Sequence, residues 1–274
     1  MNSSKKFMKN MYKSIDGEIE KCTKEIEHNP ENFEALNSRG MYYNAKKDDK
    51  AIMDFEKAIK INPNFADVYN NLGGVYVKKG DNDKALSYFN QAIRLDPKFG
   101  AALLNRAYLL CRKGDYVQSI DDYTEVIKLI TTKIDDDSIS EYEKIVEINP
   151  MYREAHFNRG VAYFYMENYD SAIEDFSVNI KRDGTDIVAY EARAMAHIKK
   201  GAHNLAIDDF TEMIELDPDH AHDEFYYKRG KEYAIIGAHN LAHADFTKAA
   251  QLGHIKAQSY LKGKGLKWKK VVVS

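Results

Sequence analysis

The stretch ADVYNNLGGVYVKKGDNDKALSYFNQAIRLDPKF, residues 66–99, predicts two helices joined by a tight turn. In its first half, apolar or small residues recur at intervals of three and four, the period of one helix face: Tyr69, Leu72, Gly73 and Tyr76. A second face of the same kind follows: Ala85, Leu86, Phe89, Ala92, Ile93 and Leu95. The sequence therefore predicts a helical hairpin.

The turn and the helix contact carry signals of their own. Gly80 can adopt the left-handed conformation that ends a helix, and Asp81 can accept backbone N–H bonds at the start of the next one. Gly73 and Ala85 are small enough to let the two helices touch, and Phe89 is expected to fill the gap between them.

All five prolines of the chain stand in one local context. They occur in HNPEN (28–32), INPNF (61–65), LDPKF (95–99), INPMY (148–152) and LDPDH (216–220). Successive prolines are 33, 34, 53 and 68 residues apart, which is one period near 34, once with 19 extra residues and once doubled. Such a period is typical of a solenoid, whose units bury their apolar faces only against their neighbours.

The unit resembles the tetratricopeptide repeat, with Tyr in place of the family's usual Trp. Its residues follow that signature in order: Tyr69-x2-Leu72-Gly73-x2-Tyr76, then Ala85-x3-Phe89, then Pro97. The resemblance implies an all-α fold, a tetratricopeptide-type superhelix built as a right-handed solenoid of antiparallel helix hairpins.

The same frame fits most of the chain. The small site of the first helix is Gly40, Gly73, Ala107, Gly160, Ala194 and Gly230. The small site of the second helix is Ala51, Ala85, Ser119, Ala172, Ala206 and Ala242. The aromatic site is Phe55, Phe89, Tyr123, Phe176, Phe210 and Phe246. We therefore expect six full repeats.

The frame also predicts the domain organisation. The expected segments are a flexible basic N-terminus (1–13), a lone second helix plus three repeats (14–130), an inserted helical segment (131–150), three repeats (151–253), a capping helix (254–264) and a basic tail (265–274). The turn of the first repeat is one residue short and lacks Gly. Because an unpaired helix reverses the chain direction, we expect the array to bend at 131–150.

Composition bounds the function classes. The 274 residues are 44% hydrophobic and 30% charged, with a net charge of −3 and no linker rich in Gly, Ser and Pro. Cys22 and Cys111 lie far apart within helical patterns and are interpreted as buried free thiols in a reducing compartment. The N-terminal stretch lacks the apolar core of a signal peptide, and no segment is apolar enough to span a bilayer. We expect a cytoplasmic protein.

Arginine recurs at one site, next to the small residue of the first helix: Arg39, Arg106, Arg159, Arg193 and Arg229. The same five repeats have Asp just before the aromatic site: Asp54, Asp122, Asp175, Asp209 and Asp245. The remaining repeat has Leu72 and Tyr88 at these two sites. Because the charges occur together, we predict five structural ion pairs rather than an anion-binding ladder, which disfavours nucleic acid as a ligand.

Metal, cofactor and catalytic signals are weak. The pairs His220/His222 and His239/His243 flank a predicted helix about 20 Å long, so they cannot converge on one ion. The acidic run at 134–138 lacks the glycine and the final glutamate of a calcium loop. Phosphate loops, nucleophile elbows and metalloprotease motifs do not occur. We expect no metal, no cofactor and no enzymatic activity.

The C-terminus is basic. No acidic residue follows Asp245, whereas seven lysines do: Lys248, Lys256, Lys262, Lys264, Lys267, Lys269 and Lys270. With Trp268, this end has the composition to contact an anionic membrane or RNA. The interpretation we favour is a polar cap followed by a flexible tail.

The function that these patterns favour is a non-enzymatic scaffold that binds a protein or peptide partner. The family resemblance implies a concave groove lined by the first helices. Two alternatives stay open: a self-assembling structural protein, and an adaptor attached to an anionic surface through the basic tail. The sequence does not decide the oligomeric state.

The resemblance also suggests groove residues. Asn71, Asn105 and Asn158 occupy equivalent sites, similar to the asparagine ladder with which some tetratricopeptide superhelices hold an extended peptide. Beside them, the expected groove contains Asn70, Tyr108, Phe157, Phe164 and Tyr227. The alternative is that the asparagines bond only within their own hairpins and that some aromatic residues pack between repeats.

One known groove type is disfavoured. The family's clamp for chaperone tails needs lysines and an arginine on three successive first helices to hold a terminal carboxylate. Here the second to fourth repeats carry Asn70, Asn71, Leu104, Asn105, Tyr108, Phe157 and Asn158 at the groove-facing sites. We therefore expect peptides ending in Glu-Val-Asp not to bind.

Overall fold

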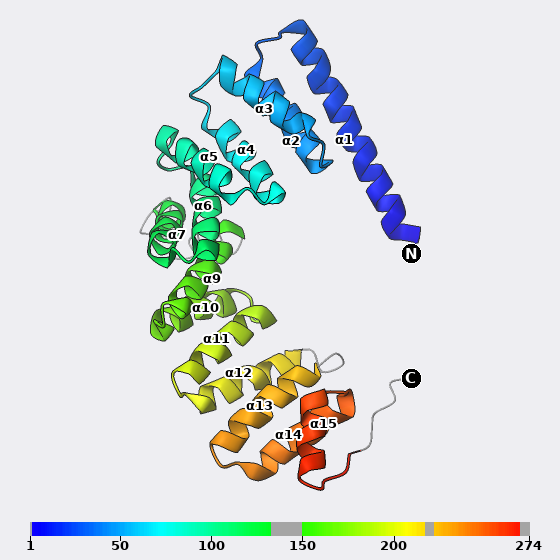
Figure 1. The fold of residues 1–274 in the computed structure, drawn as a ribbon, viewed down its shortest axis with the longest axis vertical. Helices are drawn as coiled ribbons and strands as arrows, with labels where there is room; N and C mark the ends of the chain where they lie inside the picture. The colour runs from blue at the N-terminus through cyan, green and yellow to red at the C-terminus, as the bar shows by residue number, and fades with distance from the viewer. Residues whose placement is uncertain (1, 133–149, 217–221, 269–274) are drawn as a thin grey trace. The chain divides into compact units, whose positions relative to one another are not determined.

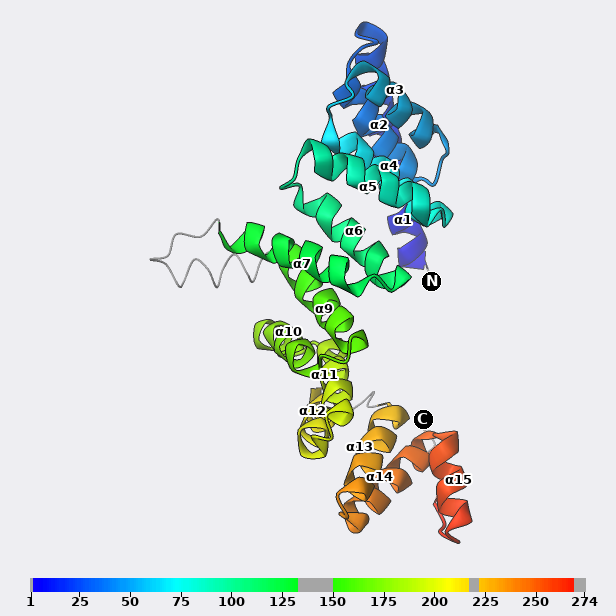
Figure 2. The ribbon, with the colours of Figure 1, turned by 60° about the vertical axis from the view of Figure 1, so that its left-hand side comes forward.

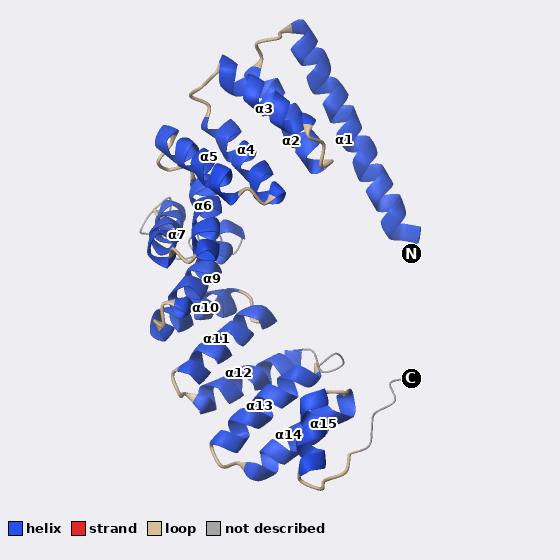
Figure 3. Cartoon of the chain, viewed as in Figure 1, coloured by secondary structure: helices blue, strands red, loops and turns tan. Residues whose placement is uncertain are grey.

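The computed structural model describes residues 2–132, 150–216 and 222–268, and within these ranges every regular element is an α-helix (Figures 1 and 3). The all-α fold class is confirmed. The helices fall into two compact units, Met1–Leu129 and Ile130–Ser274, which are described separately. In the described ranges, no helix combines the length and apolar character needed to cross a membrane.

Unit 1 is a stack of hairpins that follows one long helix. Its helices are α1 (Asn2–His28), α2 (Phe33–Ala45), α3 (Lys50–Ile61), α4 (Ala66–Lys79), α5 (Asn82–Leu95), α6 (Gly100–Lys113) and α7 (Tyr116–Thr131), the end of which passes the unit boundary. The pairs α2–α3, α4–α5 and α6–α7 are the three expected repeats. Each helix packs mainly on its sequence neighbours, as both views show for α2 to α5 (Figures 1 and 2).

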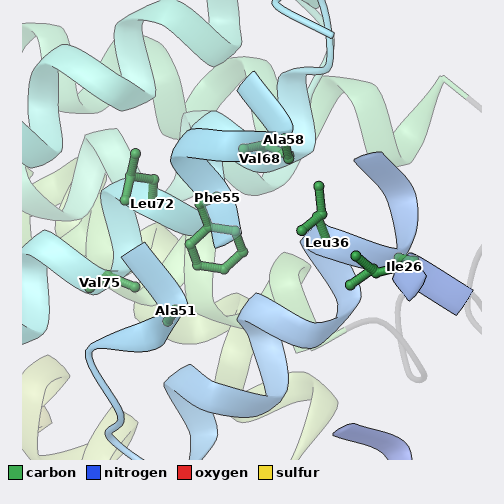
Figure 4. Packing of buried hydrophobic residues seen from close by; sticks show 9 residues of the cluster. Ile26, Leu36, Ala51, Phe55, Ala58, Val68, Leu72 and Val75 are labelled. Carbon is green, nitrogen blue, oxygen red and sulfur yellow. The ribbon is translucent and has the colours of Figure 1, made fainter. Parts of the chain in front are cut away.

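The core of unit 1 runs across the repeat boundaries. Figure 4 shows the ring of Phe55 among side chains from four helices, including Ile26 of α1, Leu36 of α2 and Leu72 of α4. Phe55, Leu36 and Leu72 are fully buried. Since each hairpin buries its apolar face against the next, the repeats stabilise one another rather than folding as separate globules.

The small sites of the first helices are fixed by the aromatic rings. A Cβ added to Gly73 would lie 2.5 Å from Cε1 of Phe89, and one added to Gly40 would lie 2.6 Å from Cε1 of Phe55. No real Cβ contact is that short, so a larger residue would force the ring and the helix apart. The predicted roles of Gly73 and Phe89 are confirmed.

The turns show where glycine is needed. Gly80 has φ 79° and ends α4, and Asp81 accepts a hydrogen bond from the backbone N–H of Lys84, as predicted. The short turn of the first repeat reaches the same conformation without glycine, because Lys47 takes φ 58°. Glu167 does so at φ 61° in the turn before α10 (Tyr169–Arg182). Both side chains sit in a backbone region that costs an L-residue energy.

Unit 2 repeats the arrangement and ends in a cap. Its helices are α9 (Pro150–Tyr165), α10 (Tyr169–Arg182), α11 (Ile187–Lys199), α12 (His203–Leu216), α13 (Asp223–Ile235), α14 (His239–Leu252) and α15 (Ile255–Gly263). They form three hairpins, and α15 packs on α14 through Ala257 and Leu261, which are fully buried. The bounds of α15 agree with the expected capping helix to within one residue at each end.

The N-terminal segment differs from the expectation. Residues 2–13, expected to be a flexible arm, belong to α1, which is about twice as long as the other helices. The segment contains no proline or glycine before Gly17, so nothing in the sequence stops the helix once it has formed.

Two contacts give the later part of α1 the place of a second helix. Lys46, just after α2, reaches Asp16 of α1 at 2.6 Å, and Lys79 at the end of α4 reaches Asp49, just before α3, at 2.5 Å in the same register. Arg39 likewise donates to Oγ1 of Thr23 in α1 at 3.1 Å. Most of the expected insertion at 131–150, where a bend was also expected, falls on residues 133–149, outside the described residues.

Candidate functional site

In five of the six repeats, a bidentate ion pair joins the first helix to the second helix. Arg106, for example, donates from Nε and Nη2 to the two carboxylate oxygens of Asp122, at 2.8 and 2.6 Å. The same pair occurs as Arg39–Asp54, Arg159–Asp175, Arg193–Asp209 and Arg229–Asp245. The arginine side chains are 16–22% exposed and the aspartates 4–9%. The five predicted pairs are confirmed, and each places a carboxylate against the guanidinium group within its own hairpin.

The arginines also connect neighbouring repeats. A further N–H of Arg106 donates to Oδ1 of Asn90 at 2.8 Å, and that of Arg193 donates to Oγ of Ser177 at 3.0 Å. Arg229 makes the same contact with Thr211 at 3.0 Å. The acceptor lies on the preceding second helix in each case. A small polar residue 16 residues before most of these arginines was the signal in the sequence, and it was missed.

The asparagines of unit 1 lie between first helices. Nδ2 of Asn71 in α4 donates to Oδ1 of Asn37 in α2 at 2.9 Å. Nδ2 of Asn105 in α6 donates to Oδ1 of Asn70 in α4, also at 2.9 Å. The amides thus bond between repeats, whereas the alternative considered from the sequence placed their hydrogen bonds within single hairpins. Asn70, Asn71 and Asn105 are all half-buried.

These amide pairs mark a site where adjacent first helices always meet. In unit 2 the equivalent site of α11 and α13 holds an ion pair, Glu191 with Lys228, at 2.7 Å. The equivalent site of α9 and α11 holds Phe157 and Ala192, which belong to one apolar cluster. The same position is therefore amide, apolar or ionic in different repeats. The packing of adjacent first helices requires two side chains of complementary chemistry at this position, and a pair of asparagines is one such combination.

The amides keep capacity for a ligand after these bonds. A carboxamide offers two donors and one acceptor. Asn71 uses one N–H and Asn70 uses its oxygen, and within residues 2–132 no further partner is present for the other groups of these two side chains. Both can still pair with the N–H or C=O of a main chain laid across α2, α4 and α6.

Two hollows lie between α9 and α11 in the described part of unit 2, and α10 contributes to the walls of both. One has a volume of about 600 Å³ and is lined by Pro150, Arg153, Glu154, Phe157, Asn158, Asn179, Arg182, Asp186 and Val188. The other has about 230 Å³ and is lined by Val161, Phe164, Tyr165, Phe176, Ala192 and Met195. Phe157 and Phe164 lie two turns apart on α9, about 10 Å along the helix. The cleft is therefore mixed in polarity at one end and apolar at the other.

The remaining groove residues divide into exposed and packed ones. Tyr108 is 42% exposed, with the guanidinium of Arg112 at 5.7 Å from its ring. Tyr227 instead stacks on the ring of His254 at 4.1 Å, so much of its surface is used within unit 2. Leu104, interpreted as groove-facing, is only 7% exposed; this is a correction, and its apolar side chain is buried instead.

The expected groove residues divide between the two units, which are described separately. Asn70, Asn71, Asn105 and Tyr108 belong to unit 1, and Phe157, Asn158, Phe164 and Tyr227 to unit 2. Each set is a candidate surface by itself. In unit 1 the surface is amide-rich, and in unit 2 it is apolar next to Asn158.

Metal and thiol chemistry find little support in the described ranges. There, no group of three or more His, Cys, Asp or Glu side chains is placed to hold a metal ion. Nδ1 of His243 lies 3.0 Å from the hydroxyl of Thr247 in its own helix. Burial raises the pKa of both cysteine thiols, which lowers their reactivity. Cys22 is buried as expected, but Cys111 is only half-buried.

Comparison with known families agrees with the repeat frame. Residues 40–80 match a model described as TPR repeat. Models described as tetratricopeptide repeat match residues 66–99, 88–121, 154–177 and 187–220. Together these matches cover about half of the chain and fall in both units.

Two curated relatives match over a small part of their length. Hsp70-Hsp90 organizing protein 3 of Arabidopsis thaliana is 33% identical over 78 residues, which is 28% of this chain and 14% of the relative. Hsp70-Hsp90 organising protein of Plasmodium falciparum is 27% identical over 93 residues, 31% of this chain and 16% of the relative.

Solved structures show the same fold at low identity. The C-terminal part of a TPR repeat-containing protein from Cytophaga hutchinsonii aligns with a TM-score of 0.69 at 18% identity, covering 93% of this chain and 98% of that one. YrrB, described as a TPR protein with an unusual peptide-binding site, aligns with a TM-score of 0.60 at 19% identity, covering 76% of this chain and 97% of that one.

Proposed function

The chain belongs to the tetratricopeptide repeat family, and from this premise we propose that it is a non-enzymatic, cytoplasmic scaffold that binds an extended segment of a protein partner on its first-helix surfaces. The observation that carries the proposal is the cleft between α9 and α11. Val161 and Phe164 of α9 line its apolar hollow, and Asn158 of the same helix lines the hollow of mixed polarity.

The chemistry of the cleft suits an extended segment. The hollow of about 230 Å³ is large enough for one apolar side chain, and its aromatic walls favour aliphatic or aromatic groups. An extended chain advances about 3.3 Å per residue, so a segment of roughly three residues spans the two hollows. Asn158 can pair with the main chain of that segment whatever its sequence.

Unit 1 offers a second surface for the same kind of ligand. Asn70, Asn71 and Asn105 present amide groups in successive first helices, and Tyr108 lies exposed beside them. This surface favours main-chain pairing with weak sequence selectivity.

The names of the two curated relatives raise the question of a chaperone partner. The lysines that would grip a terminal carboxylate are missing from the second to fourth repeats, where Asn70, Asn105 and Phe157 stand at or next to the clamp sites. We expect fluorescence anisotropy to detect no binding of a peptide ending in Glu-Val-Asp. Micromolar affinity for such a peptide would show that another set of cations replaces the clamp.

Affinity capture from the native lysate tests the proposal. The parent is compared with Val161→Ser/Phe164→Ser, which makes the small hollow polar. The matched control, Leu205→Ser/Leu241→Ser, changes two exposed apolar residues of second helices. We expect partner proteins that the parent and the control retain and the cleft variant loses. If parent and cleft variant recover the same proteins in the same amounts, the cleft is not the binding site.

A further inference from the structure

Helix α15 has one buried and one basic side. Ala257 and Leu261 face α14 and are fully buried. Four lysines of α15 and the turn after it are exposed: Lys256, Lys262, Lys264 and Lys267. We call these four residues the α15 lysine surface.

The C-terminal end of the α15 lysine surface is attached to α14 and α15. The backbone N–H of Leu266 donates to the carbonyl of Leu261 at 2.9 Å, which closes the helix end. Trp268 packs against the apolar cluster of α14 and α15. Lys264 lies within the turn that this hydrogen bond closes, and Lys267 lies between Leu266 and Trp268, so both lysines are close to points where the chain is attached to α15.

The positive charge of the surface is not offset nearby. No acidic residue follows Asp245 in the sequence. Among the described residues, none of the four lysines forms an ion pair with a carboxylate. The acidic side chain that contacts the start of α15 is Glu224, and it is already paired with His254 at 2.9 Å and Lys228 at 3.6 Å.

Exposed apolar groups accompany the lysines. Ile255 is 76% exposed, Tyr260 44% and Leu266 37%. A helix that combines lysines with exposed aliphatic and aromatic side chains suits the boundary between lipid headgroups and acyl chains. A nucleic acid would use the lysines but not Ile255 and Leu266. The ring of Tyr260 lies 4.6 Å from that of Phe246, which leaves less of its face for base stacking.

We propose that the α15 lysine surface docks on a bilayer containing anionic phospholipid, with Ile255 and Leu266 inserted at the headgroup level. The interaction is peripheral and reversible, and it is separate from the peptide site proposed above. Each lysine near an anionic membrane strengthens binding roughly fivefold. The four together therefore account for at least about a hundredfold in vesicle partitioning.

Co-sedimentation of the full chain with vesicles tests the proposal. The vesicles are phosphatidylcholine alone or equal parts of phosphatidylcholine and phosphatidylserine. We expect the parent to sediment only with the anionic vesicles and to dissociate as salt is raised, because salt screens the charges. Replacing the four lysines by glutamine should lower the partition coefficient at least about a hundredfold.

Two further variants make the test specific. Lys21, Lys57, Lys60 and Lys98 are exposed lysines of unit 1. Their replacement by glutamine changes the net charge equally and should leave vesicle binding unchanged. Ile255→Ser/Leu266→Ser should weaken vesicle binding several-fold. The proposal is overturned if the parent does not bind anionic vesicles, or if both lysine variants lose vesicle binding equally. It is also overturned if the chain binds RNA instead of vesicles and Ile255→Ser/Leu266→Ser leaves the affinity for RNA unchanged.

Discussion

At the scale of the residue, the arginine–aspartate pairs are the interactions that the sequence pattern predicts most directly. Each arginine uses two nitrogens within its hairpin and, in four repeats, a third toward the helix before it. Removing one partner of such an ion pair lowers the free energy of unfolding more than replacing both partners together. The reason is that the remaining charge stays buried without a partner. The second repeat supplies the natural replacement, Leu72 with Tyr88, which belong to one apolar cluster.

Substitutions in the third repeat test this account. Asp122→Ala leaves the guanidinium of Arg106 without its carboxylate, and we expect the free energy of unfolding to fall by about 3 kcal/mol. The double substitution Arg106→Leu/Asp122→Tyr copies the second repeat and should recover most of that loss. Urea denaturation followed by circular dichroism measures both. Equal destabilisation by the single and double variants would contradict the account.

At the scale of the element, the hairpin turns share one backbone conformation but differ in the conformational energy of the residue at positive φ. Most hairpin turns place glycine at positive φ, as Gly114 does at φ 87°. The turn after α2 lacks a glycine and places Lys47 there instead. An L-residue in this region costs about 1 to 2 kcal/mol, and glycine recovers most of it despite its greater freedom when unfolded.

Lys47→Gly should therefore raise the free energy of unfolding by about 0.5 to 1 kcal/mol. The matched control is Gly114→Lys, which puts the same side chain into the left-handed position of another turn and should lower stability by a similar amount. Thermal denaturation of both variants gives the comparison. If Lys47→Gly is neutral or destabilising, the backbone of Lys47 carries no strain.

The secondary-structure elements were predictable where packing allows only one kind of residue at a position. The small residue of the first helix and the aromatic residue of the second helix gave the register of each hairpin, and in four hairpins the small residue is a glycine that lies against the ring. The long helix α1 was not predictable, because side-chain pattern shows where a helix packs and not how far it extends beyond its contacts. The pairing of Asn71 with Asn37 was missed for another reason: contacts between repeats depend on how adjacent hairpins are rotated, which the pattern within one repeat does not contain.

At the scale of the whole molecule, function was only partly predictable. The family and the fold follow from the repeat frame, and the comparisons confirm both. The groove residues stay a prediction, and the structure divides them between two units with different chemistry, amide-rich in unit 1 and apolar in unit 2. Ligand identity depends on which side chains a few exposed positions carry, and those positions are free to vary because the fold does not constrain them.

The most direct test is to titrate the partner segment found by capture into the parent and the triple variant Asn71→Ala/Asn105→Ala/Asn158→Ala. Asn64→Ala/Asn204→Ala/Asn240→Ala removes three exposed asparagines elsewhere and serves as the control. Isothermal titration calorimetry should show weaker binding to the triple variant, by about 1 to 2 kcal/mol for each asparagine on the surface that holds the segment, with the control unchanged. Circular dichroism confirms that the variants are folded. A folded triple variant that binds as tightly as the parent would contradict recognition of the peptide main chain by the first helices.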